Sequence, residues 1–443
     1  MLKHSNTILF VVILIGGLII RAFSLETNGL WLDEIWSMIA SSPDHSLKDV
    51  IFNALKDTHP PLFDVILFWS LKLSGNAEFT ARYLALLFGL IAMLACYHYG
   101  KKIGGSKTNG LLLMAICSFN FFHIYYSIEG RFYSLLFLLS LICTAEFYLY
   151  FKEEKRKHAI IYFISSILLC YTHYYGGILL ASLSIVALVY FIIKSTSKKL
   201  FLQFVGVQFL VLLAFAPCIP YLIGKTSLES WMSDPTIGDF FNYYYLYSGK
   251  NPLEFAWLFL PLLFYFKVGK DKNLKLLLYL SIILGFLLPY LVSKIGSPML
   301  HKRYTLIYLP AIYIMSMQAW RQLSFVGLSK SKWIYGIVAV SCILNIAFLR
   351  DEFRDDSKDQ WKEVAQFLAE EKAEHIVADQ AHYLNFYLNR EGLSKATMGL
   401  SDKECWVLKT NFDEMDPLKA QNVEILEEKE FPKDFRLYKV SVK

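Results

Sequence analysis

Long apolar runs separated by short basic loops are the feature of this sequence that most restricts its fold. A helix needs about 20 apolar residues to cross a bilayer, and eleven segments of the 443-residue chain approach that pattern. Hydrophobic residues make up 55% of the chain and charged residues 19%, below the roughly 25% of a soluble domain. We therefore predict an α-helical polytopic membrane protein. The expected spans are 7–24, 79–100, 110–126, 132–151, 158–171, 176–193, 200–223, 253–266, 274–292, 304–320 and 333–349.

The basic loops predict the orientation of these spans, because Lys and Arg favour the cytoplasmic side. Alternation from those loops places the polar tail and five loops outside: 27–61, 128–131, 172–176, 224–252 and 293–303. Segment 61–73 stays open, since it is apolar but short. It could be a juxtamembrane or re-entrant helix or a twelfth span, which gives a range of about 11–13 transmembrane helices.

Charge predicts a domain boundary at Asp351. Residues 351–443 carry 21 acidic and 14 basic residues, a net charge of −7, whereas residues 1–350 carry 17 and 30, a net of +13. The apolar runs also stop there. We expect residues 1–350 to form a transmembrane domain and residues 351–443 a small extracytoplasmic α/β domain. Its expected helices are 359–368 and 381–389, and its expected strands are 375–379, 405–409 and 435–440.

Polar side chains next to membrane spans are functional candidates by default, because they are expensive to bury there. The first group is Asp33 and Glu34, just after the first span. A partly desolvated carboxylate can act as a general base. The alternative is that Asp33 simply begins a helix.

The other polar groups lie in the same outer loops. His59 could contact an anion, with Asp57 orienting it or binding a cation, although both could be ordinary residues at a helix boundary. Glu129 and Arg131 could bind substrate or pair structurally. The remaining candidates are His173, Lys302, Arg303 and, at the outer end of its span, Arg82. Carboxylates and cations on one membrane face suit group transfer from a lipid phosphate.

Loop 224–252 is rich in aromatic residues and contains Trp231, Asp234 and Asp239. It could form a lid or a surface that faces an acceptor. An interfacial aromatic belt explains the same composition equally well.

The order of these motifs resembles the GT-C glycosyltransferases. The likeness rests on WLDE at 31–34, DTHPPL at 57–62, Arg82, YSIEGRFYSL at 126–135, YTHYYG at 171–176 and HKRY at 301–304. It is greatest to the bacterial branch related to protein O-mannosyltransferases and the lipid A aminoarabinose transferase. The resemblance implies a hexosyl- or pentosyltransferase of the bacterial cytoplasmic membrane with its site on the outer face. Its donor would be a polyprenyl-phosphate sugar and its acceptor a glycan, lipid or protein.

The resemblance also implies roles for individual residues. Asp33 would be the base in an inverting displacement, and Glu34 would orient it or the acceptor. The donor phosphate would contact some of the cationic residues, with others structural: His59, Arg82, Arg131, His173 and Arg303. In the aminoarabinose transferases a Lys stands where this chain has His59, which puts an aminoarabinose donor in doubt.

Cofactors and other partners are less defined by the sequence. We expect no tightly bound metal, because no Cys or His spacing is typical of one, although Asp33 and Asp57 could share a divalent cation. The positive charge lies in cytoplasmic loops and does not indicate a nucleic-acid partner. A transporter or flippase for lipid-linked sugars is the alternative. It should show repeated halves with charges at mid-membrane, and the charges here lie at span ends.

Overall fold

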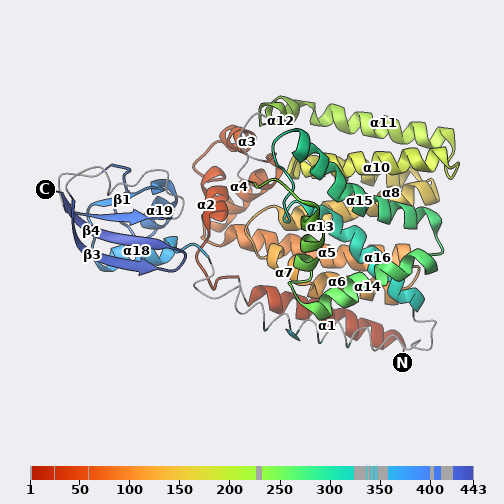
Figure 1. Cartoon of the computed structure of the whole chain (residues 1–443), viewed down its shortest axis with the longest axis horizontal. Helices are drawn as coiled ribbons and strands as arrows, with labels where there is room; N and C mark the ends of the chain where they lie inside the picture. Colours follow the sequence, from red (N-terminus) through yellow and green to blue (C-terminus); the bar gives the residue numbers. More distant parts are fainter. Residues whose placement is uncertain are drawn as a thin grey trace.

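The computed structural model describes residues 2–23, 25–57, 59–225, 232–323, 358–399, 404–410 and 423–442, with positions 336, 340, 343, 344 and 347. A bundle of helices forms most of the molecule, and a small α/β domain lies at one end of it (Figure 1). The elements that build the bundle are α1 (Leu2–Ala22), α5 (Thr80–Gly104), α6 (Lys107–Phe119), α7 (Phe121–Ser127), α8 (Tyr133–Glu153), α9 (Arg156–Thr172), α10 (Tyr175–Ile192), α11 (Lys198–Phe215), η1 (Ala216–Cys218), α12 (Ile219–Lys225), α13 (Ile237–Tyr247), α14 (Pro252–Val268), α15 (Lys272–Ile295), η2 (Thr305–Tyr308) and α16 (Leu309–Leu323).

Ten of the eleven expected spans coincide with helices of this bundle. By length and composition, five of the described helices can cross a membrane, or six if the bent pair α6 and α7 counts as one span. The eleventh expected span, 333–349, lies largely outside the described residues, as do the expected boundary at Asp351 and Trp231. The chain is thus a multi-span membrane protein with a mostly helical fold.

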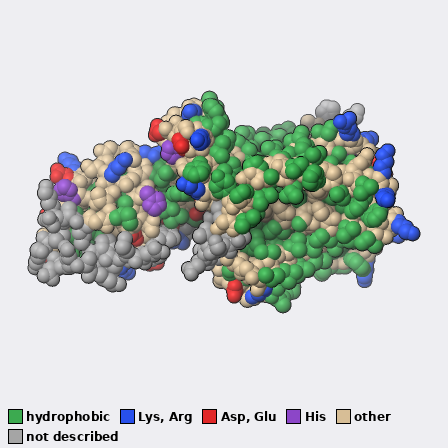
Figure 2. Space-filling view, turned by 90° about the horizontal axis from the view of Figure 1, so that it is seen from above, with side chains coloured by type: hydrophobic (Ala, Val, Ile, Leu, Met, Phe, Trp, Pro, Cys, Tyr) green, Lys and Arg blue, Asp and Glu red, His purple; other side chains and the backbone are tan. Residues whose placement is uncertain are grey.

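The bundle has a buried centre and a surface suited to lipid. In α8, 94% of the apolar window is buried, against 17% in the segment Lys198–Gly224. Figure 2 shows a broad hydrophobic surface over the bundle, with Lys and Arg side chains gathered at the end away from the small domain. That distribution agrees with the basic loops that the sequence places on the cytoplasmic side.

The pair α6 and α7 is bent by 65° at Asn120. The Asn120 side chain accepts a hydrogen bond from the backbone N–H of His123 and so begins α7. Arg21, at the end of α1, is fully buried and donates to the carbonyls of Cys117 and Ser118 at the end of α6. These bonds satisfy carbonyls that the break leaves without helical partners.

Three short helices lie at the end of the bundle that faces the small domain: α2 (Leu32–Ala40), α3 (Leu47–Lys56) and α4 (Leu62–Ser74). Helix α4 covers the segment whose crossing the sequence leaves open. Its 13 residues reach about 20 Å at 1.5 Å per residue, short of the roughly 30 Å of hydrocarbon in a bilayer. This segment is therefore a short helix at the bundle end, and it is not among the helices that are long and apolar enough to span by length and composition.

The small domain has a four-stranded sheet in the order β1-β2-β4-β3. Strands β1 and β2 are parallel, and the other two pairs are antiparallel. All five elements that the sequence predicts are present, and β3 is an additional strand. The elements are α18 (Trp361–Glu370), β1 (Ile376–Ala378), α19 (Ala381–Leu388), β2 (Cys405–Lys409), β3 (Val423–Phe431) and β4 (Phe435–Val442).

Candidate active site

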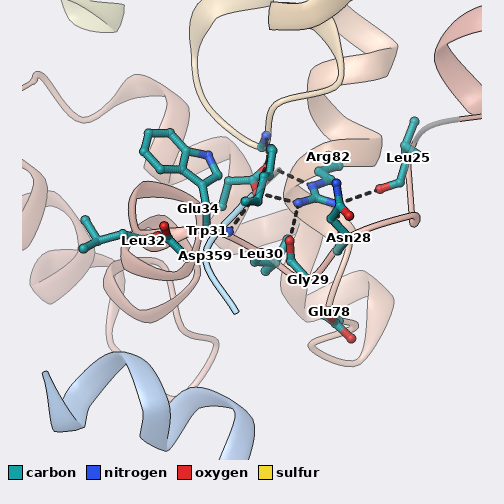
Figure 3. A network of polar contacts seen from close by, with 12 residues as sticks. Leu25, Asn28, Gly29, Leu30, Trp31, Leu32, Glu34, Glu78, Arg82 and Asp359 are labelled. Carbon is teal, nitrogen blue, oxygen red and sulfur yellow. Dashed lines mark hydrogen bonds and ion pairs between the residues drawn. The ribbon is translucent and has the colours of Figure 1, made fainter. Parts of the chain in front are cut away.

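Helix α2 carries both residues of the first external carboxylate pair, and the two side chains have different surroundings. Glu34 is fully buried, whereas the side chain of Asp33 is 28% exposed. The Glu34 carboxylate accepts hydrogen bonds from Nε and Nη2 of Arg82 at 2.9 and 2.7 Å. Figure 3 shows this forked pair between α2 and the start of α5. Such a two-point ion pair fixes orientation as well as charge.

Arg82 also holds the loop that precedes α2. Its Nη1 and Nη2 donate to the carbonyls of Leu25, Asn28 and Gly29 at 2.8–2.9 Å. With these bonds and the Glu34 pair, the guanidinium is engaged by protein and is only 2% exposed. The geometry therefore favours a structural role for Arg82 over contact with a donor phosphate.

Glu34 joins two further segments to this centre. It accepts a hydrogen bond of 2.6 Å from the backbone N–H of Gly130, and its Oε2 lies 3.6 Å from Nζ of Lys358. Burial raises the pKa of Glu34, but the Arg82 and Lys358 charges and the hydrogen bonds outweigh it and hold the pKa at about 2. A carboxylate that stays ionised and fully bonded is suited to hold the site together, not to take up a proton.

Asp33 faces the opposite way, toward Arg303. Its Oδ2 accepts a hydrogen bond of 2.9 Å from Nη1 of Arg303, and the same nitrogen donates to the Tyr133 hydroxyl at 3.2 Å. The guanidinium also lies 5.7 Å from the centre of the Trp31 ring. Arg131 holds α2 by two hydrogen bonds: its Nη1 donates to the Asp33 carbonyl at 3.0 Å and to Ser37 Oγ at 2.6 Å.

A cavity of about 340 Å³ opens beside this pair. Three cationic side chains line it, Lys250, Lys302 and Arg303, together with Glu129 and His301. Five aromatic residues complete its wall together with Leu246 and Gly249: Trp31, Phe121, Phe122, Tyr125 and Tyr126. A cavity with cations at one part and aromatic rings around it can hold an anionic group joined to a sugar or an apolar chain.

Glu129 is the acidic residue of this cavity. It is buried, and its Oε1 has no hydrogen-bond partner among the described residues. Burial raises its pKa, to about 7, although Lys358 and Arg303 oppose the shift. The carboxyl therefore changes its protonation state near neutral pH and can donate or accept a hydrogen bond there.

The fold is similar to that of solved membrane-protein structures over nearly the full length of the chain. The apo structure of ArnT from Cupriavidus metallidurans has a TM-score of 0.65 at 13% identity, covering 100% of this chain and 99% of that chain. The same protein bound to undecaprenyl phosphate has a TM-score of 0.59 at 13% identity, with 98% of each chain covered. The chain therefore shares the fold of ArnT over its whole length.

Two further comparisons agree with this fold. Residues 58–223 match the family model of dolichyl-phosphate-mannose-protein mannosyltransferase. The oligosaccharyltransferase of Archaeoglobus fulgidus, in complex with Zn and sulfate, has a TM-score of 0.53 at 13% identity over 89% of this chain and 63% of that chain. No significant match is found among curated protein sequences.

The second sequence cluster, Asp57 and His59, forms a separate group next to α2. His59 Nε2 lies 3.4 Å from Asp57, and Nδ1 lies 3.4 Å from Asp64, a residue that the sequence reasoning missed. Asp57 also accepts a hydrogen bond of 2.8 Å from Trp36 Nε1. Burial raises the pKa of Asp64, although the nearby His59 opposes the shift.

His173 lies in an aromatic cluster near the cavity but is not among its lining residues. The centre of its ring is 4.9 Å from that of Phe132 and 4.7 Å from that of Tyr304. Its Nδ1 accepts a hydrogen bond of 3.1 Å from the backbone N–H of Tyr175. Thus Glu129, Lys302 and Arg303 line one cavity, and Asp33 adjoins it through its bond to Arg303. Arg82 and His173 lie in its surroundings.

Sequence reasoning missed two charged groups of the site, Lys250 and Lys358, and included His301 only as part of the motif at 301–304, without a role of its own. Lys250 and His301 stand in external loops, and the signal that singled out Lys302, a basic residue on the outer side, applies to Lys250 as well. Burial, with help from Arg303 and Lys302, lowers the pKa of His301 to about 3, so this imidazole is neutral.

A divalent cation shared by Asp33 and Asp57 would need carboxylate oxygens that other groups already bind. Asp33 is bound to Arg303, and Asp57 to Trp36 and His59. Among the described residues, no group of three or more His, Cys, Asp or Glu side chains is arranged to hold a metal ion. A cation at this place would have to compete with the protein partners of both carboxylates.

Proposed function

We propose that this protein transfers a sugar from a polyprenyl-phosphate donor to an acceptor hydroxyl. The single observation that carries the proposal is the Asp33–Arg303 pair at the rim of a cationic and aromatic cavity. It sets a carboxylate that can act as base beside a cation that can hold a phosphate. The proposal is further supported by the GT-C fold and by the likeness to ArnT bound to undecaprenyl phosphate.

In the proposed reaction, Asp33 accepts the proton of the acceptor hydroxyl as its oxygen attacks the anomeric carbon. The new glycosidic C–O bond forms while the bond from that carbon to the phosphate oxygen breaks. The electron pair of the broken bond leaves with the polyprenyl phosphate. One in-line displacement inverts the anomeric configuration.

The proposed phosphate site consists of Arg303, Lys302 and Lys250. Cations aimed at the leaving phosphate stabilise the negative charge that develops there. The aromatic wall of the cavity, including Tyr125 and Tyr126, offers faces on which a sugar ring can stack. We assign Glu34 and Arg82 to positioning, because each is bonded to the other and buried.

We further infer that the site and the small domain face the exterior of a bacterial cytoplasmic membrane. Helix α5 carries Arg82 in its first turn, next to the site, and Lys101 and Lys102 in its last turn. Over 25 residues it spans about 37 Å, enough to cross a bilayer. Basic residues at the far end then mark the cytoplasmic side.

The decisive experiment replaces Asp33 by Asn in the full-length protein. A strain that lacks the gene is complemented with each variant, and its envelope glycans are compared by mass spectrometry. The amide side chain has nearly the same shape as the carboxylate but cannot act as base, so the sugar-bearing product should fall at least 100-fold. Asp44→Asn, an exposed substitution in the same loop, is the matched control. Wild-type product levels in the Asp33→Asn strain would refute the assignment of the base.

A further inference from the structure

The segment that leads into the small domain contacts the first residue of α2. Asp359 Oδ2 accepts a hydrogen bond of 3.1 Å from the backbone N–H of Leu32, and Figure 3 places these residues side by side. The first N–H groups of a helix have no partner within the helix. A carboxylate at this end also interacts favourably with the helix dipole. Asp359 therefore caps α2 from a position 327 residues away in sequence.

The residue before Asp359 reaches the other carboxylate of α2. Lys358 Nζ lies 3.6 Å from Glu34 Oε2, and its side chain is only 13% exposed. Burial lowers the pKa of Lys358, and the Glu34 carboxylate opposes that shift. Separating a buried ammonium from its buried carboxylate is costly, because each charge would then be buried without a partner. Lys358 and Asp359 thus contact α2 on both sides of Asp33.

A third contact fixes the chain just ahead of α2. The hydroxyl of Tyr387, a residue of α19, accepts a hydrogen bond of 2.6 Å from the backbone N–H of Leu30. It donates one of 2.9 Å to the Glu78 carboxylate. Residues 30 and 32 are therefore both bonded to the small domain. Between them stands Trp31, which lines the cavity and lies against the Arg303 guanidinium.

We propose that the small domain is a positioning element for the transfer reaction and that Asp359 is its principal positioning residue. By capping α2, Asp359 sets the direction in which Asp33 projects, so that its carboxylate meets Arg303 at the cavity. Lys358 and Tyr387 hold the same segment against rotation. This inference rests on the proposed role of Asp33 as base.

The test compares Asp359→Ala with Asp359→Asn in the full-length protein in nanodiscs. The rate of amide hydrogen exchange in peptides that cover α2 measures how well the first N–H groups of the helix are bonded. The amount of sugar-bearing envelope product in the complemented strain measures turnover. The Ala variant should exchange about tenfold faster at the start of α2, as expected for one lost hydrogen bond. Its product should fall at least tenfold. The Asn variant keeps an oxygen acceptor and should restore both readouts to within about twofold of wild type.

Lys439→Met is the matched control. Lys439 pairs with Glu404 at 3.0 Å within the small domain, away from α2, so neither readout should change by more than about twofold. Tyr387→Phe, which removes one hydroxyl without a cavity, should raise exchange at Leu30. This second variant keeps the test valid should Asp359→Ala fold poorly.

The outcomes separate this inference from the proposed function. Unchanged exchange in both Asp359→Ala and Tyr387→Phe would overturn the capping role. Faster exchange with full product would overturn the link to catalysis. Equal losses in the Lys439→Met control would show that any change in the small domain has this effect and would overturn a specific role for Asp359. If Asp33→Asn retained activity while Asp359→Ala still loosened α2, the assignment of the base would fail and the cap would stand.

Discussion

Arg303 donates a hydrogen bond of 2.9 Å to Asp33, a residue 270 positions earlier in the chain. The pair brings the proposed base and the proposed phosphate ligand into direct contact. If both assignments hold, a donor phosphate at Arg303 is expected to compete with the Asp33 carboxylate and so to release it toward an acceptor. We therefore expect donor binding and activation of the base to be coupled.

Arg303→Ala should weaken binding of undecaprenyl phosphate at least tenfold, because hydrogen bonds to charged groups contribute about 1.5–3 kcal/mol. Asp33→Asn should not weaken this binding, since it removes only the competing carboxylate. Affinities of purified protein in nanodiscs, measured by titration with undecaprenyl phosphate, distinguish the two. Arg436→Ala, which changes an exposed side chain of β4, is the control. Unchanged affinity in Arg303→Ala would remove this residue from the phosphate site.

The Glu34–Arg82 pair should govern stability more than turnover. Glu34→Gln leaves the buried Arg82 guanidinium without its counter-charge, and breaking such a pair costs about 3–5 kcal/mol. Thermal unfolding in detergent should show the loss. Arg82→Lys should not restore stability, because an ammonium cannot bond two carboxylate oxygens and three carbonyls in the same planar arrangement. A stability equal to wild type in Glu34→Gln would contradict the anchoring role.

The sequence predicted the membrane part well because span length and loop charge are local properties. It also placed the polar clusters on one face, and four of the predicted residues do line or border the cavity: Asp33, Glu129, Lys302 and Arg303. From the resemblance it made Asp33 the base and Glu34 an orienting residue, but it could not show that only Glu34 is fully buried. That burial depends on α5 and on residues 129–131, so it could not be predicted from the local sequence.

Long-range contacts account for most of what the sequence could not show. Asp359 capping α2 joins residues 327 positions apart, and neither residue type signals its partner. Strand β3 was missed for a local reason, since five consecutive positions, 424–428, are exposed and largely acidic. Such a segment lacks the alternation of apolar and polar residues that identifies a half-buried strand.

Gly130 should not tolerate a side chain. A Cβ at this position would lie 2.9 Å from the Ala81 Cβ and 3.2 Å from Glu34 Oε1, while its backbone N–H is bonded to Glu34. Gly130→Ala should lower stability by about 1–3 kcal/mol, the usual range for overpacking, and should lower product as well. Gly177→Ala is the control, because a Cβ there meets none of the described residues within 4 Å. Equal melting temperatures for the two variants would contradict the close approach.

Glu129 should make stability depend on pH. Its pKa of about 7 in the folded protein lies above the ordinary 4.5, so the folded state holds more protons than the unfolded state between these values. The contribution of Glu129 to the free energy of unfolding is therefore complete below about pH 4.5 and is lost as the pH rises to about 7. The loss approaches about 3 kcal/mol at 1.36 kcal/mol per unit.

Glu129→Gln, which resembles the protonated acid, removes that dependence. The variant should match wild type in thermal unfolding near pH 5 and exceed it near pH 8. Glu371→Gln, at an exposed position of the small domain, should show no such difference between the two pH values. If undecaprenyl phosphate binds beside Glu129, its negative charge further favours the protonated carboxyl. Affinity of the wild type should then fall from pH 6 to pH 8 more steeply than affinity of Glu129→Gln. Parallel pH profiles for the two proteins would place Glu129 away from the bound phosphate.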